Sequence, residues 1–354
     1  MKNHKKFFKK TKSLPVDEFF QKVLYEKKIG YYNTIQPFGK DGDFITAPKI
    51  SNLFSEMIAI WIISTWENFD KPKVFNIVEL GPGDGSLMKI LINVFKKFPN
   101  FNNAKKIYFY EKSKLLISKQ KKYFNKKQVS WIDNFDKVRK GPVILFGNEF
   151  LDAIPIKQFI KEKNIFLEKY FQVNQVDNIE EIYKKASKKD VQIIKSFKTL
   201  KELKFIEFPK LGFKILDKII KKIQKFEGCL LLIDYGYIKQ ANKNTLQSVK
   251  RHKKNDIFKN LGEADVTSHV NFSLLDEYFL KNKMKVKKTI TQNEFLRKLG
   301  IIERAEILGK KMKFSDQTNL YLRLKRLLSP KSMGDLFKVI LAYKFKKNNY
   351  LGFD

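Results

Sequence analysis

Val78-Glu79-Leu80-Gly81-Pro82-Gly83-Asp84-Gly85-Ser86-Leu87 is the stretch of this sequence that decides the fold. It follows an apolar run at 74–78 and precedes a segment with helical character at 87–92. A glycine motif set between a strand and a helix indicates cofactor binding. Glycine can adopt positive φ and lets the backbone approach a bound molecule closely. The sequence therefore predicts a cofactor site at Gly81, Gly83 and Gly85.

The spacing of the glycines indicates the kind of cofactor. A dinucleotide fingerprint places its third glycine at i+5, whereas Gly85 stands at i+4 from Gly81. The closer spacing, with Glu79 two residues before Gly81, resembles motif I of class I S-adenosylmethionine-dependent methyltransferases. A carboxylate at the strand end suits the methionine ammonium, so Glu79 is a candidate ligand. The alternative interpretation is a glycine turn that binds nothing.

Length and composition limit the number of domains and the kinds of partner that the chain can have. Its 354 residues are 43% hydrophobic, enough for one large α/β domain with insertions or for two domains. The formal charge is 72 − 37 = +35, almost all of it from lysine. Such a charge favours binding to acidic protein surfaces, RNA or anionic membranes at low salt. The lysines are scattered and interleaved with acids, so we expect no specific nucleic-acid site.

The cysteine, the histidines and the apolar runs bear on the chemistry and cellular location of the protein. Cys229, the only cysteine, lies in an apolar run and is expected to be a buried strand residue in a reducing compartment. The three histidines do not form a metal-binding pattern, and no apolar run approaches the roughly 18 residues of a transmembrane helix. The basic segment 1–12 resembles neither a signal peptide nor a transit peptide. These features favour the bacterial cytoplasm, with the mitochondrial matrix as the alternative.

The region 1–70 is expected to form helices and a lid. A helix is predicted over 14–27 and another over 52–66, with a loop rich in glycine and proline between them. That loop contains Asp43 and Thr46 close to an aromatic residue. We interpret these two residues as part of a lid or substrate loop; the alternative is a purely structural loop.

A βαβ pattern follows the glycine turn. The strand predicted at 106–111 ends in Glu111, whose two carboxylate oxygens can accept hydrogen bonds from both hydroxyls of a ribose. The strand predicted at 129–133 ends in Asp133, a weaker candidate for contact with the adenine amino group. For Glu111 the alternative is an exposed strand end.

Polar residues also follow the fourth predicted strand, at 143–147. Asn148, Glu149 and Asp152 stand within five residues of one another. Ligands and reactions of doubly wound sheets lie outside the carboxyl ends of the strands, so this turn is expected to contribute to the active site. The alternative is that the acids only stabilise the N-terminus of a helix.

The rest of the pattern completes an α/β fold with elaborations. Residues 157–227 are predicted to form an α+β insertion, whose last helix, at 212–226, leads into a strand at Cys229. Segment 242–265 is polar and is expected to be an irregular mobile loop. We predict an N-terminal helical and lid region (1–70), a core (71–156 and 228–354) and the insertion on the substrate side.

Several unusual motifs together resemble the MidA family. They are Gly42-Asp43-Phe44-Ile45-Thr46-Ala47-Pro48, the glycine turn, Asn148-Glu149-Phe150-Leu151-Asp152-Ala153, Leu232-Ile233-Asp234-Tyr235-Gly236 and Gly262-Glu263-Ala264-Asp265-Val266-Thr267. Shorter matches continue to about residue 345, so the resemblance covers most of the chain. The chain departs from the family before His252, where Val249-Lys250-Arg251 replaces an aromatic-Arg-Gly run.

The resemblance implies a doubly wound class I fold with a mostly parallel seven-stranded sheet and S-adenosyl-L-methionine as cofactor. It also implies symmetric dimethylation of an arginine on a protein, with a subunit of respiratory complex I as the candidate substrate. By analogy with protein arginine methyltransferases, Glu149 would orient the guanidinium and Asp152 would assist or receive a proton. Asn148 is grouped with the cofactor ligands. Asp234 and Glu263 join the lid residues as candidates around the substrate pocket.

Two other classes of function stay open at this point. One is a methyltransferase for RNA or a small molecule, although the turn lacks the Pro-Pro-aromatic signature that base-amino methyltransferases use to stack a flipped base. The other is a non-catalytic assembly factor, which would not need the intact glycines and carboxylates. Besides a protein substrate, a homodimer is considered as an assembly.

Overall fold

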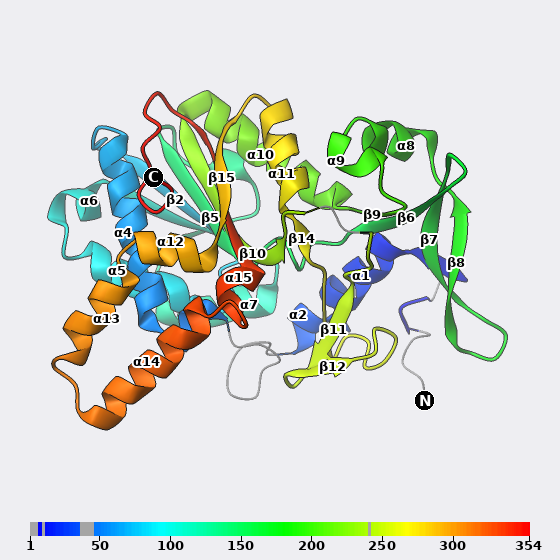
Figure 1. Ribbon diagram of the computed structural model, residues 1–354, viewed down its shortest axis with the longest axis horizontal. Helices are drawn as coiled ribbons and strands as arrows, with labels where there is room; N and C mark the ends of the chain where they lie inside the picture. The colour runs from blue at the N-terminus through cyan, green and yellow to red at the C-terminus, as the bar shows by residue number, and fades with distance from the viewer. Residues whose placement is uncertain (1–5, 9–10, 36–45, 240–241) are drawn as a thin grey trace.

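The computed structural model describes residues 6–8, 11–35, 46–239 and 242–354 (Figure 1). The largest sheet lies between two layers of helices, in the left-hand part of the view in Figure 1. Its strands, in spatial order, are β15 (Lys285–Thr291), β16 (Phe337–Lys344), β10 (Gly228–Tyr237), β5 (Val143–Asn148), β2 (Phe75–Leu80), β3 (Lys105–Tyr110) and β4 (Ser130–Ile132). The short strand β14 (Val270–Asn271) pairs with β10 beside this path.

The direction of the strands matches the predicted class. From β10 through β5, β2 and β3 to β4, every neighbouring pair is parallel. β16 lies antiparallel between β10 and β15. The prediction of a doubly wound, mostly parallel seven-stranded sheet is therefore confirmed.

Helices cover both faces of the sheet, which explains why the central strands β2, β5 and β10 are buried almost along their whole length. One face packs against α4 (Asn52–Asn68), α5 (Ser86–Phe95), α6 (Pro99–Ala104), α12 (Gln292–Lys298), α13 (Ile301–Gly309) and α14 (Phe314–Leu328). The other face packs against α10 (Lys210–Phe226) and α11 (Phe272–Lys281). α10 is amphipathic: its apolar stripe is formed by Leu216, Ile219, Ile220 and Ile223, all buried. Cys229 is buried in β10, as the sequence predicts.

A second, antiparallel sheet is built largely from the insertion. Its order is β1 (Ser13–Pro15), β7 (Ile165–Val173), β6 (Lys157–Glu162) and β9 (Phe205–Phe208), and β8 (Ile179–Lys185) also pairs with β7. The strand β1 was not predicted. Pro15 is extended, with φ −61° and ψ 155°, so the helix predicted from residue 14 is α1 (Val16–Tyr25). The N-terminal segment is thus paired with the insertion.

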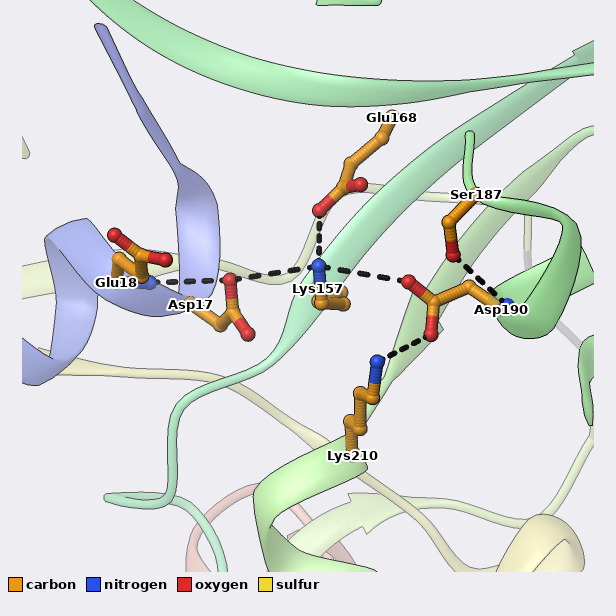
Figure 2. Close-up of polar contacts among 7 residues, drawn as sticks. All are labelled: Asp17, Glu18, Lys157, Glu168, Ser187, Asp190 and Lys210. Carbon is orange, nitrogen blue, oxygen red and sulfur yellow. Dashed lines mark hydrogen bonds and ion pairs between the residues drawn. The ribbon is translucent and has the colours of Figure 1, made fainter. Parts of the chain in front are cut away.

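A buried ion cluster joins these two segments (Figure 2). The Lys157 ammonium, on β6, forms an ion pair with Glu168 of β7. It also lies 3.9 Å from a carboxylate oxygen of Asp17 in α1 and 3.7 Å from one of Asp190 in α8 (Lys188–Lys195). Lys210, at the start of α10, pairs with Asp190 at 2.6 Å. Five elements therefore meet at two lysines and three carboxylates.

Segment 242–265 is more ordered than its composition predicts. It contributes β11 (Gln247–Lys250), β12 (Lys253–Asn255) and the first residue of β13 (Asp265–Thr267), which form a three-stranded antiparallel sheet in the order β12-β11-β13. Leu246 and Val266 anchor this sheet in a cluster with α1. The expectation of an irregular loop was wrong because backbone pairing and two apolar anchors suffice for such short strands. No helix among the described residues has the length and apolarity needed to cross a membrane.

We expect Lys157→Ala to destabilise the fold by about 3–5 kcal/mol, because it leaves the buried Glu168 and the partly buried Asp17 without their cation. Burial already raises the pKa of Glu168 and of Asp17 in the intact protein. Protonation of these acids removes the uncompensated negative charge. The loss of folding stability in Lys157→Ala should therefore be smaller at pH 5 than at pH 8. Thermal denaturation at both values tests this, with the exposed Lys185→Ala as the matched control. An equal loss at both values would contradict the account.

Candidate active site

A cleft of about 680 Å³, part of it open to solvent, lies at the carboxyl ends of the parallel strands. Its walls come from segments far apart in the sequence. They include Tyr25 of α1, Tyr32 of α2 (Tyr31–Thr34), Gly81, Gly83, Glu111 and Glu149. The structure therefore brings the glycine turn, the end of β3 and the turn after β5 together, as the sequence predicts.

The glycine turn is shaped for close approach. Gly81 and Gly83 have φ values of 62° and 57°, in the left-handed region that favours glycine. A Cβ atom added at Gly81 would lie 3.1 Å from the Phe150 ring, which also borders the cleft. Gln120 supports the turn from α7 (Lys114–Tyr123): its amide nitrogen donates to the Gly83 carbonyl at 2.7 Å. The sequence offered no pattern that singles out Gln120.

Gly85 has a different role. It precedes α5 with φ 81°, and a Cβ atom there would lie 2.6 Å from the Phe124 ring. It is not among the residues that line the cleft. Asp84 accepts a hydrogen bond from the Ser86 backbone N–H at 3.1 Å and pairs with Lys49 at 2.8 Å. The turn is thereby tied to α3 (Ala47–Ile50).

The chemistry around the turn fits S-adenosyl-L-methionine. Glu79 is 3% exposed, and its Oε2 atom has no hydrogen-bond partner among the described residues. The Oδ1 atom of Asn148, at the end of the neighbouring strand β5, is also buried without one. An ammonium group supplies the donors that both acceptors lack. Burial raises the pKa of Glu79, because the ionised carboxylate is costly away from water. A bound cation would offset that cost of ionisation.

Glu111 also lines the cleft and is positioned by its own backbone. Its Oε1 atom accepts hydrogen bonds from the N–H groups of Lys112 and Ser113, both at 2.8 Å. Burial raises the pKa of this carboxyl to about 7. Asp133, in contrast, is exposed and pairs with Lys137 at 2.6 Å, outside the residues that line the cleft.

The turn after β5 carries the predicted catalytic pair. Glu149 has φ 53°, an uncommon conformation for a residue with a side chain and one found at functional sites. The Asn148 amide nitrogen donates to its Oε1 atom at 3.1 Å, and the Ala47 backbone N–H is a further donor to its carboxylate. Asp152 is buried and accepts a 2.7 Å hydrogen bond from the Tyr235 hydroxyl. Its other oxygen has no partner among the described residues.

Asp234 holds this turn in place. Its Oδ2 atom accepts hydrogen bonds from the backbone N–H groups of three consecutive residues, Phe150 (3.1 Å), Leu151 (2.8 Å) and Asp152 (3.2 Å). Its Oδ1 atom accepts from the N–H of Tyr235 at 2.9 Å. Asp234 is only 1% exposed and does not line the cleft. The sequence grouped it with substrate residues, but its contacts are those of a positioning residue.

The carboxyl groups of Glu149, Asp152 and Asp234 lie close together, so ionisation of one makes ionisation of the others less favourable. Burial, reinforced by the charge of Asp152, raises the pKa of Glu149 to about 8. Burial raises the pKa of Asp152 to about 6. The same cause raises the pKa of Asp234, although its backbone donors favour the charged form. No ion pair within the described part of the chain neutralises any of them, so the site favours a cationic ligand.

The predicted lid and substrate residues lie in different places. Asp43 lies outside the described residues. Thr46 precedes α3, next to Ala47 at the Glu149 carboxylate. Glu263 is exposed and pairs with Lys250 at 2.9 Å, away from the cleft.

Asp265, in the same motif as Glu263, comes closer to the cleft. It is buried, and its Oδ2 atom accepts a long hydrogen bond of 3.4 Å from the hydroxyl of Tyr32. The tyrosine rings of α1 and α2, Tyr25 and Tyr32, stack at 5.4 Å. Sequence reasoning missed all three residues, because nothing in the local pattern shows that the N-terminal helices reach this sheet.

Comparisons with known proteins agree with the geometry. A family model for S-adenosyl-L-methionine-dependent methyltransferases matches residues 57–290. The chain is 28% identical over 350 residues to the mitochondrial protein arginine methyltransferase NDUFAF7 homolog of Caenorhabditis elegans, covering 91% of this chain and 80% of that protein. It is 28% identical over 355 residues to mitochondrial NDUFAF7 of Homo sapiens, another protein arginine methyltransferase, covering 93% and 80%.

A solved structure has the same fold. It is a crystal structure of a Burkholderia thailandensis protein bound to S-adenosyl-homocysteine. The TM-score is 0.79 and the sequence identity 23%, over 96% of this chain and 90% of that one.

We expect Gly81→Val to weaken S-adenosyl-L-methionine binding at least about tenfold, because the new side chain meets Phe150 and strains a positive-φ position. Isothermal titration calorimetry measures the effect. Gly300→Ala is the matched control, since Gly300 also has positive φ but lies away from the cleft. Unchanged affinity in Gly81→Val would mean that the cofactor does not lie against this turn.

We expect Glu149→Gln to be more stable than the parent protein at pH 8. The pKa of Glu149 is raised in the folded protein from 4.5 to about 8. Its stabilising contribution is therefore complete below pH 4.5 and is lost as the pH rises through 8. Glutamine does not ionise, so the gain in melting temperature should vanish near pH 4.5. Calorimetric scans from pH 4.5 to 9 test this against the exposed Glu162→Gln; identical curves for Glu149→Gln and the parent would refute it.

Proposed function

This chain belongs to the family of S-adenosyl-L-methionine-dependent methyltransferases, as its MidA-like motifs indicated, and we propose that it methylates arginine side chains of a protein. The predicted cofactor is confirmed with the family. The observation that carries the proposal is the pair of acids Glu149 and Asp152, neither of which has a neutralising cation among the described residues. Glu149 lines the cleft together with Gly81 and Gly83. The printed names of the relatives, protein arginine methyltransferases, support it.

The carboxyl groups suit a guanidinium for an electrostatic reason. Arginine stays protonated at neutral pH, and its planar fork of N–H donors matches carboxylate oxygens. Its positive charge would offset the mutual repulsion that raises the pKa of Glu149 and favour the ionised carboxylate. An uncharged ligand would gain no such energy.

Each residue of the turn has a distinct task in this proposal. Glu149 accepts N–H groups of the guanidinium and orients one nitrogen toward the glycine turn. Asp152 stands ready to receive the proton that this nitrogen loses, and the Tyr235 hydroxyl, donating to Asp152 at 2.7 Å, holds its carboxylate in place. Glu79, Asn148 and Glu111 would hold the cofactor, which when bound supplies an electrophilic methyl group on a sulfonium. Tyr25 and Tyr32 restrict the access of water.

The proposal also covers the methylated product, the substrate protein and the cellular compartment. We propose symmetric dimethylation of an arginine on a subunit of respiratory complex I. We propose the bacterial cytoplasm as the location, with the mitochondrial matrix as the alternative that the names of the relatives support. A homodimer is the assembly to be checked by light scattering.

The test uses the full chain with tritium-labelled S-adenosyl-L-methionine in lysate of the source cells. We expect label on a protein, recovered as dimethylarginine after hydrolysis. Glu149→Gln should slow labelling about 100-fold or more and leave cofactor affinity unchanged. The exposed Glu263→Gln should label like the parent protein. Label in RNA or a small molecule, or full activity of Glu149→Gln, would overturn the proposal.

A further inference from the structure

The helical hairpin of α13 and α14 projects from the helical layer, with its tip pointing away from the rest of the molecule (Figure 1). Its base is firmly attached. The Arg304 guanidinium of α13 pairs with Glu56 of α4 at 2.7 Å, and Leu324, Leu327 and Leu328 of α14 are buried in the main core. The other end of the hairpin has no such anchor in the described structure.

The tip exposes large apolar side chains. Phe314, the first residue of α14, is 84% exposed and is the most exposed of the large hydrophobic residues in the described chain. Met312 beside it is 40% exposed. Ile307 and Leu322, further from the tip, are 56% and 59% exposed. Single exposed apolar residues are common, but a cluster at the end of a projection indicates a contact surface.

Lysines alternate with these apolar residues. Lys310, Lys311 and Lys313 are all exposed, and none forms an ion pair within the described residues. With Asp316, the only acid in the first turn of α14, the segment from 310 to 316 has a net charge of 3 − 1 = +2. The tip therefore presents both apolar surface and positive charge.

Backbone hydrogen bonds hold the tip in one shape. The N–H groups of Lys311 and Met312 donate to the carbonyls of Leu308 (3.1 Å) and Gly309 (2.9 Å). The N–H groups of Asp316 and Gln317 donate to the Lys313 carbonyl at 3.0 and 2.9 Å. Met312 and Phe314 are thus presented by an ordered turn, so little conformational entropy is lost when a partner binds.

We propose that this tip binds the surface of an anionic lipid membrane. Met312 and Phe314 enter the interfacial layer, and Lys310, Lys311 and Lys313 contact the acidic headgroups. A bilayer presents negative charge above an apolar layer, which complements lysines interleaved with bulky apolar residues. The tip is also convex: a protein partner would need a matching groove, whereas a bilayer accepts a projection. The proposal does not depend on the arginine chemistry of the cleft.

Co-sedimentation of the full chain with vesicles tests the proposal. The vesicles are phosphatidylcholine alone, or phosphatidylcholine with 30 mol% phosphatidylglycerol, in roughly 0.15 M salt, near physiological ionic strength. We expect binding only to the anionic vesicles. Met312→Ser with Phe314→Ser should weaken it about tenfold or more, and Lys310, Lys311 and Lys313 changed together to Gln should have a similar effect. In Phe314→Trp, tryptophan emission should shift to shorter wavelength on adding the anionic vesicles.

Matched controls separate the tip from the general basic charge. Tyr123→Ser with Leu280→Ser removes two residues that are 63% and 60% exposed on other helices, and should bind like the parent protein. Lys126, Lys127 and Lys140 changed together to Gln remove equal charge elsewhere and should weaken binding less than twofold. The proposal is overturned if the parent protein does not bind, if a control set weakens binding as much as its tip counterpart, or if the tryptophan emission does not shift.

Discussion

The active site depends above all on the hydrogen bonds between Asp234 and the turn after β5. One oxygen of Asp234 binds three successive backbone N–H groups, and the other binds the N–H of Tyr235. β10 and β5 are adjacent and parallel, so their carboxyl ends meet at the same edge of the sheet. A side chain on one strand can therefore fix the backbone of the next. This contact holds Glu149 in its left-handed conformation and sets where Asp152 lies.

That arrangement also has an electrostatic cost. The buried carboxyl groups of Glu149, Asp152 and Asp234 repel one another, and burial raises the pKa of each. Glu79 adds a further buried acid near the glycine turn. A folded chain tolerates such groups when a ligand can compensate their charge. These buried acids therefore favour cationic ligands, which in our proposal are the methionine ammonium and a guanidinium.

The second sheet tethers α1, which contributes Tyr25 to one wall of the cleft. Lys157 links β6 and β7 to α1 through Glu168 and Asp17. At the end of α1, the Tyr25 hydroxyl donates to the Ala153 carbonyl, next to Asp152, at 3.0 Å. The ion cluster thus belongs to the same structural unit as the wall of the active site, although it takes no part in the chemistry.

The sequence by itself determined the central sheet, the glycine turn and the position of the acids at and just after the strand ends: Glu79, Glu111, Glu149 and Asp152. These features follow from local order: an apolar strand, a glycine turn and a helix place their polar residues at one edge of a parallel sheet. Only the tertiary structure decided the rest. It placed Asp133 and Glu263 in solvent, turned Asp234 from a substrate candidate into a support, and brought Tyr25, Tyr32, Gln120 and Asp265 to the site. The physical reason is that these positions depend on contacts between segments far apart in the chain, which leave no periodic signal in either segment.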